Sequence, residues 1–244
     1  MSRILPVVVL LFVGTDVCRA DTVSFEQAGA RKAAARVRNW FSGYHQGPLC
    51  NGTGTLVRVE QGRGVVLTAA HLFAEAIGPI TVEFFDGQVS GATLLALDKQ
   101  LDVAALWIYA PRGIEPLPMT DESPQLGEQI EIWGYGPERF RSFLAVRSKP
   151  IPFFADRPGS LLGAQGVENH MVTIPGDSGG AVVWHGRLVG MHWGYRGAED
   201  DPRRCVHAVN ARQLRHWLAS RLDSESPAAP LGTLANVRHE TQPR

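Results

Sequence analysis

Three residues whose side chains could together break an acyl bond occur in the order His, Asp, Ser. His71 ends a Thr-Ala-Ala-His segment, Asp102 precedes an apolar run (103–108), and Ser178 is the centre of a Gly-Asp-Ser-Gly-Gly segment. A serine hydroxyl becomes an effective nucleophile only when a neighbouring base takes its proton. An imidazole can do so near neutral pH, and a buried carboxylate can orient that imidazole.

These requirements assign Ser178 as nucleophile, His71 as general base and then acid, and Asp102 as the orienting carboxylate. Asp98 competes with Asp102, but Asp102 directly precedes a buried strand, which places its carboxylate at the mouth of that strand. Taken singly, each residue also has a structural interpretation, such as a core histidine or a turn serine. The three settings together favour the catalytic interpretation.

The glycines around Ser178 suggest how the developing oxyanion is held. The backbone N–H groups of Gly176 and Ser178 can converge on an oxyanion if the loop adopts dihedral angles that glycine tolerates. Gly179 and Gly180 keep side chains away from adjacent backbone. Asp177 is expected to point inward and hold the loop, with no partner identifiable from the sequence.

The composition excludes several other classes of function. The 24 basic and 24 acidic residues balance, which does not favour a nucleic-acid partner or an anionic membrane surface. Neither a zinc-binding motif nor a nucleotide-binding glycine pattern is present. We therefore expect no cofactor and no metal.

Residues 1–20 have the pattern of a secretory signal, with Arg3 before an apolar run that is too short for a permanent membrane helix. We expect a mature chain that begins near Asp21, is secreted or periplasmic, and has no stable membrane insertion. An N-terminal strand of the fold is the alternative for this segment.

Removal of the signal takes away Cys18 and leaves Cys50 and Cys205. Two cysteines in an oxidising compartment could form a disulfide. Two separate thiols are equally compatible with the sequence, because spacing alone does not show that the two residues come close enough to bond.

The pattern of elements predicts an all-β fold made of two antiparallel six-stranded barrels. Short strands at close spacing, a proline-rich crossing near 111–125 and a closing helix at 210–218 favour barrels, although a β-sandwich is also compatible. An N-terminal arm (21–51) is expected to be helical over 25–41, or else a disordered basic leader, and the tail (224–244) to be disordered. The predicted strands are 54–59, 65–68, 81–85, 94–97, 103–108, 129–133, 140–146, 161–162, 170–174, 181–184, 188–193 and 205–209.

The segments around His71, Asp102 and Ser178 resemble the three signature segments of the chymotrypsin/trypsin-like serine protease superfamily, and the resemblance runs over 52–218. It implies a protease domain (52–223) of two perpendicular barrels with the three residues in the cleft between them. It also implies a monomeric, secreted serine endopeptidase that acts on polypeptides through an acyl-enzyme.

Departures from the superfamily point toward bacterial secreted members, such as the glutamyl endopeptidases and protease domains of the HtrA kind. The Ile-Val-Gly-Gly-like start of the animal enzymes is not found before Gly52, so its pairing with Asp177 is in doubt, and Leu72 replaces the cysteine that often follows the histidine.

The segment around His192 resembles the one with which glutamyl endopeptidases read an acidic side chain before the cleaved bond (P1). Thr173 stands five residues before Ser178, as a threonine does in that group. By this resemblance Thr173 and His192 line the P1 pocket, and His192, Trp193 and Gly194 pair with the substrate backbone. A strand histidine without selectivity is the alternative, and a catalytically silent fold that binds peptides is the alternative function.

Overall fold

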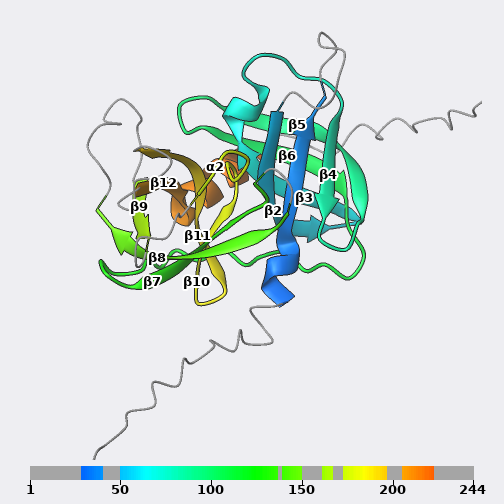
Figure 1. Ribbon diagram of the computed structural model, residues 1–244. Helices are drawn as coiled ribbons and strands as arrows, with labels where there is room; N and C mark the ends of the chain where they lie inside the picture. The colour runs from blue at the N-terminus through cyan, green and yellow to red at the C-terminus, as the bar shows by residue number, and fades with distance from the viewer. Residues whose placement is uncertain are drawn as a thin grey trace, which may run out of the picture.

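The strands of this protein curl into two barrels that lie side by side (Figure 1). The computed structural model describes residues 29–40, 50–136, 139–149, 161–166, 173–196 and 205–222. The predicted signal segment (1–20) and the tail (224–244) lie outside these residues. Both barrels are closed and antiparallel, with six strands each, as predicted.

The first barrel has the strand order β1-β2-β3-β6-β5-β4. Its interior follows from alternation along each strand: in β4, Ile80, Val82 and Phe84 are buried, whereas Thr81 and Glu83 are half-buried. The strands are β1 (Ala34–Asn39), β2 (Cys50–Glu60), β3 (Arg63–Ala69), β4 (Ile80–Phe84), β5 (Val89–Asp98) and β6 (Val103–Tyr109).

The second barrel has the order β10-β11-β12-β9-β8-β7, and helix α2 (Ala211–Leu222) packs against β11 and β12. Asn210 caps the helix, because its Oδ1 accepts the Gln213 amide at 2.9 Å. The strands are β7 (Gln129–Gly134), β8 (Arg141–Ser148), β9 (Leu161–Gly166), β10 (Ala181–Trp184), β11 (Arg187–Arg196) and β12 (Cys205–Asn210).

The helical arm predicted within 21–51 is wrong over Ala34–Asn39, which form β1 and pair with β2 and β4. Within the described residues, the helical residues Gly29 and Ala30 and the short 3₁₀ turn η1 (Arg31–Ala33) precede the strand. Val37 is fully buried, whereas Arg38 reaches Glu83 on β4 at 2.7 Å. Alanine and arginine favour a helix, but pairing on both sides and burial of one face outweigh that preference.

The strand predicted at 170–174 is also corrected where it can be checked. Thr173 and Ile174 belong to the loop before Ser178 rather than to a strand, and residues 170–172 lie outside the described residues. The loop uses the backbone groups of this segment for a turn, which removes them from sheet pairing.

The possible Cys50–Cys205 disulfide is not formed, because Cys50 is a free cysteine. Cys50 begins β2 and pairs with Asn39 in the first barrel, whereas Cys205 begins β12 in the second. Burial raises the pKa of the Cys50 thiol, and the nearby Glu75 carboxylate adds to the effect. Cys50 is therefore held as a neutral thiol.

Among the described residues, no helix is both long and apolar enough to cross a membrane, and no three His, Cys, Asp or Glu side chains gather as metal ligands.

Candidate active site

Sheet pairing in the first barrel brings His71 and Asp102 together. Ala69, the last residue of β3, pairs with Val103, the first residue of β6. His71 follows β3 in the 3₁₀ turn η2 (Ala70–Phe73), and Asp102 immediately precedes β6. Because the two strands are antiparallel neighbours, the residue that leaves one and the residue that enters the other lie side by side.

Asp102 holds both the backbone and the ring of His71. Its Oδ1 accepts the His71 amide at 2.8 Å, and its Oδ2 lies 2.8 Å from the His71 Nδ1. The carboxylate side chain is only 6% exposed, whereas the imidazole is 42% exposed. An ionised carboxylate only accepts hydrogen bonds, so Nδ1 carries the proton. Nε2 is then the ring nitrogen that can accept a proton.

The backbone at Asp102 is in the left-handed region, with φ at +55°. This conformation costs a residue with a side chain about 1–2 kcal/mol, although aspartate visits it more readily than most residues. Asp98, the alternative carboxylate, accepts the amides of Gln100 and Leu101 at 2.9 and 3.0 Å. Asp98 therefore stabilises the turn that delivers Asp102 to His71.

Ser178 lies in the second barrel, in the loop that enters β10. Before it, the Asp177 amide donates to the Ile174 carbonyl at 3.1 Å and closes a four-residue turn. Pro175 occupies the second position and Gly176 the third, with φ at +94°. A positive φ at the third position is typical of a type II turn, which requires glycine there. The glycine before Asp177 is thus required by the turn.

The two glycines after Ser178 lie against backbone, as the sequence suggested. A Cβ at Gly179 would stand 2.1 Å from the Thr53 carbonyl, and one at Gly180 would stand 1.8 Å from the Trp133 carbonyl. Neither position can accept a side chain without moving a strand. The loop is therefore packed between β2 of the first barrel and β7 of the second.

Two backbone amides of this loop take no part in hydrogen bonds within the described part of the protein. In the described part of the chain, the N–H groups of Gly176 and Ser178 have no acceptor. These are the two amides that the sequence assigned to an oxyanion site. Ser178 is half-buried, and its hydroxyl makes no hydrogen bond to His71 among the described residues. Such contacts are often long before substrate binds.

The structure identifies the partners of Asp177, which the sequence left open. The carboxylate is fully buried; Oδ1 accepts the Gly136 amide and Oδ2 the Ile174 amide, each at 2.8 Å. Arg141 Nη2 on β8 lies 3.3 Å from Oδ1. Burial raises the pKa of Asp177, and the two amides and Arg141 oppose that effect only in part. The loop is thus anchored to the β7–β8 turn.

Sequence analysis missed Arg141 because it lies 36 positions from Asp177 and belongs to no motif. Burial of an aspartate next to a nucleophile does predict the kind of partner it needs, which is a nearby cation or several amide donors.

Thr173 and His192, the two residues assigned to the P1 pocket, are in direct contact. Thr173 Oγ1 and His192 Nε2 are 2.7 Å apart, and the two residues are 0% and 1% exposed. The N–H of His192 donates to the Gly180 carbonyl and its carbonyl accepts from the Gly179 amide, and the pairing of residues 192–194 with substrate backbone stays a prediction. The register of β11 against β12 shifts between His192 and Gly194, which leaves Trp193 as the extra residue of a bulge.

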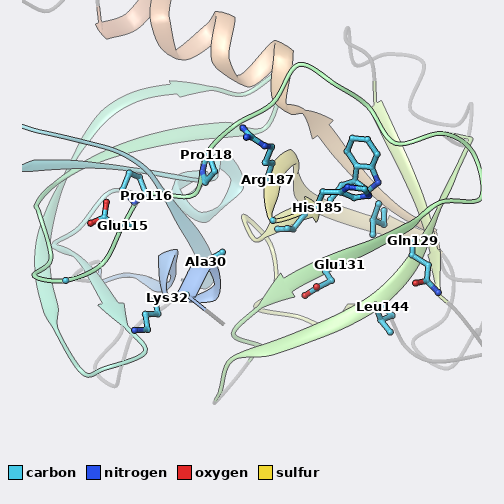
Figure 2. A pocket seen from close by; sticks show the side chains of 16 residues that line it. Ala30, Lys32, Glu115, Pro116, Pro118, Gln129, Glu131, Leu144, His185 and Arg187 are labelled. Atoms are coloured by element: carbon cyan, nitrogen blue, oxygen red, sulfur yellow. The ribbon is translucent and has the colours of Figure 1, made fainter. Parts of the chain in front are cut away.

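A pocket of about 860 Å³ lies elsewhere, between the linker that joins the barrels, the β10–β11 hairpin and the N-terminal residues 29–32 (Figure 2). Charged side chains from four segments line it: Lys32, Glu115, Glu131 and Arg187. Glu131 is already bonded to Arg31, Trp133 and Ser142. Although burial raises the pKa of Glu131, these three donors outweigh it and lower the pKa. Neither His71 nor Ser178 lines this pocket.

Residues 52–191, more than half of the chain, match the family model described as the trypsin-like peptidase domain. The chain belongs to the trypsin-like peptidase family. The matched region of this trypsin-like chain contains His71, Asp102 and Ser178. This membership agrees with the resemblance of its sequence to the chymotrypsin/trypsin-like superfamily.

Solved structures share the fold of the trypsin-like chain. A serine endoprotease from Yersinia pestis is 20% identical with a TM-score of 0.65, over 82% of this chain and 66% of that one. The chain thus spans just under two thirds of that protein. Two inactive forms of Rv3671c from M. tuberculosis H37Rv are 22% identical, with TM-scores of 0.60 and 0.58, over 82% and 80% of this chain and 92% of theirs. No curated protein sequence matches the chain.

The ion pair beneath the loop of this trypsin-like domain predicts a pH-dependent loss of stability for Arg141→Met. Without the cation, the pKa of Asp177 in the folded state rises further. Near pH ~3, below the ordinary pKa of aspartate, the carboxyl is largely protonated in both the folded and the unfolded state, so the loss is small. As pH rises, the unfolded chain ionises freely but the folded variant does not, so the loss grows to roughly 1–3 kcal/mol at about pH 8. Urea unfolding at the two pH values measures it.

Arg147→Met is the matched control, because Arg147 lies on the same strand β8 and its pKa is lowered by burial alone. Its stability loss should be the same at both pH values. Adding Asp177→Asn to Arg141→Met should abolish the pH dependence. A loss for Arg141→Met that does not change with pH would contradict the role assigned to the ion pair.

Proposed function

We propose that the protein is a serine endopeptidase that hydrolyses peptide bonds in polypeptide substrates, with Ser178, His71 and Asp102 as its catalytic residues. One observation carries the proposal: Asp102 fixes the proton on His71 Nδ1 through a 2.8 Å contact. An imidazole held in this way has Nε2 available as a base. Family membership and the turn before Ser178 add support.

In the proposed reaction, Ser178 Oγ attacks the carbonyl carbon of the scissile bond while His71 Nε2 takes the hydroxyl proton. The same imidazolium then gives that proton to the leaving amine, and the C–N bond breaks to leave an acyl-enzyme. Water, deprotonated by His71, attacks the ester and releases the acid. Asp102 stabilises the positive charge on the imidazole in both steps.

The amides of Gly176 and Ser178 are the proposed donors to the oxyanion. Both lack an internal acceptor among the described residues, so a tetrahedral intermediate would meet donors that need no other bond broken. Such donors are worth about 2.7–4 kcal/mol each in transition-state stabilisation.

A fluorophosphonate probe tests the nucleophile directly. Wild-type protein should be labelled at Ser178 under native conditions, because the reagent reacts only with a serine hydroxyl activated by a base. Ser178→Ala should abolish labelling, and His71→Ala should slow it by at least ~100-fold. Intact-mass and peptide mass spectrometry locate the label.

Ser123→Ala is the control, since Ser123 is exposed and distant in sequence from these residues. It should be labelled like the wild type. If folded wild type stays unlabelled, the enzyme proposal fails and the catalytically silent, peptide-binding alternative replaces it.

We also propose a preference for glutamate or aspartate at P1. The support is the buried pair of Thr173 and His192, whose hydroxyl and imidazole could donate hydrogen bonds to a carboxylate at the base of a pocket. A desolvated carboxylate needs such donors. Backbone pairing with the substrate is assigned to the segment of His192, Trp193 and Gly194.

Cleavage of a peptide library should occur mainly after Glu and Asp. His192→Gln and Thr173→Val should each lower the ratio of kcat/KM for a Glu substrate to that for its Leu analogue by about 10-fold or more, the value of a charge-assisted hydrogen bond. The ratio cancels any general loss of activity. Equally strong cleavage after Leu or Arg by the wild type would contradict the acidic-pocket proposal.

Secretion or periplasmic export, with a monomeric mature form, remains part of the proposal. Its support is the pattern of residues 1–20, an Arg3 followed by a short apolar run.

A further inference from the structure

Thr53 lies on β2 in the first barrel, yet most of its polar contacts are with the second. It is fully buried. Its N–H donates to the Ser178 carbonyl at 2.8 Å, and its hydroxyl donates to the Gly176 carbonyl at 2.8 Å. The Tyr135 amide donates to the same hydroxyl at 2.9 Å, and Thr68 Oγ1 donates to the Thr53 carbonyl at 2.7 Å.

The hydrogen-bond partners of the Thr53 hydroxyl allow its proton only one direction. A hydroxyl has one proton and can also accept hydrogen bonds. The Tyr135 amide can only donate, so the oxygen of Thr53 is its acceptor. The single proton therefore points at the Gly176 carbonyl. Tyr135 precedes Gly136, whose amide donates to Asp177. Thr53 is therefore connected to the same hydrogen-bond network as the buried carboxylate.

The contacts of Thr53 fall on alternate peptide groups of the loop. The Gly176–Asp177 group is held at its carbonyl by the Thr53 hydroxyl and at its N–H by the Ile174 carbonyl. The Ser178–Gly179 group is held at its carbonyl by the Thr53 N–H and at its N–H by the carbonyl of His192, at 2.6 Å.

Peptide groups are planar, so a group held at both ends cannot rotate. The two amides without an acceptor, Gly176 and Ser178, belong to the peptide groups that adjoin the held ones. Rotation of either would require a compensating change in a neighbour that Thr53 holds. Thr53, on the first barrel, therefore determines the side of the loop that both N–H groups face.

We propose that Thr53 is a positioning residue whose hydroxyl orients the amides of the oxyanion site. This role rests on the proposed peptidase function. Thr53 touches no substrate. It keeps the Gly176 amide aimed at the position of the oxyanion, which matters only as charge develops there.

Thr55 provides a matched control. It lies two residues along the same strand, is 1% exposed, and its hydroxyl has no hydrogen-bond partner among the described residues. Thr53→Val and Thr55→Val remove the same atoms from equally buried places on β2. Thr53→Ser retains the hydroxyl and should remain within about 3-fold of wild type.

For Thr53→Val we expect kcat to fall about 10- to 100-fold with KM within about 2-fold, because binding of the ground state does not use the oxyanion site. A peptide aldehyde, which forms an oxyanion on Ser178, should lose affinity in parallel. The corresponding peptide alcohol, which forms none, should bind unchanged. Thr55→Val should match wild type in all four quantities.

A measurement without turnover separates this inference from the proposed function. In ¹⁵N–¹H correlation spectra, Thr53→Val should shift or broaden the Gly176 and Ser178 amide signals, and Thr55→Val should not. This result supports the positioning role even if a fluorophosphonate fails to label the wild type. Unchanged amide signals, or equal losses of aldehyde and alcohol affinity, would overturn it. If Thr53→Val does not fold, Thr53→Ala serves in both measurements, with the same outcomes.

Discussion

The loop from Gly176 to Gly180 is packed between the two barrels, and this close packing determines most of the geometry of the site. Glycine at 179 and 180 lets the loop approach the carbonyls of Thr53 and Trp133 at distances that exclude a side chain. The polar groups of the loop that are buried must find their partners in the protein. Both barrels supply those partners, so the nucleophile is placed only when the two barrels are correctly docked.

The buried carboxylate of Asp177 is the most demanding group in this arrangement. Its removal from water raises its pKa, and two amides together with Arg141 offset part of that penalty. The cation comes from strand β8 of the folded chain rather than from a newly cut amino terminus. The group that supports the loop is therefore in place as soon as the second barrel forms.

Much of the fold follows from local patterning. Short apolar runs bounded by turn residues predicted the location of most strands, and the sequence settings of His71, Asp102 and Ser178 together predicted that His71 and Asp102 would be close. The β1 strand escaped prediction because its alanines and arginines favour a helix, and only pairing with β2 and β4 shows their alternation. Arg141 and Thr53 escaped prediction because each acts through contacts with residues far away in the sequence, and such contacts have no signature in the sequence.

The central claim is that Ser178 attacks a carbonyl whose oxygen then rests on the amides of Gly176 and Ser178. A crystal structure of the protein with a peptide aldehyde tests it most directly. The account predicts a covalent bond from Ser178 Oγ to the aldehyde carbon, with the new oxygen about 2.7–3.1 Å from both amides. His71 should then contact Ser178 Oγ while its Nδ1 remains bonded to Asp102. An aldehyde that is unbound, attached elsewhere, or bound with its oxygen turned away from Gly176 would contradict the account.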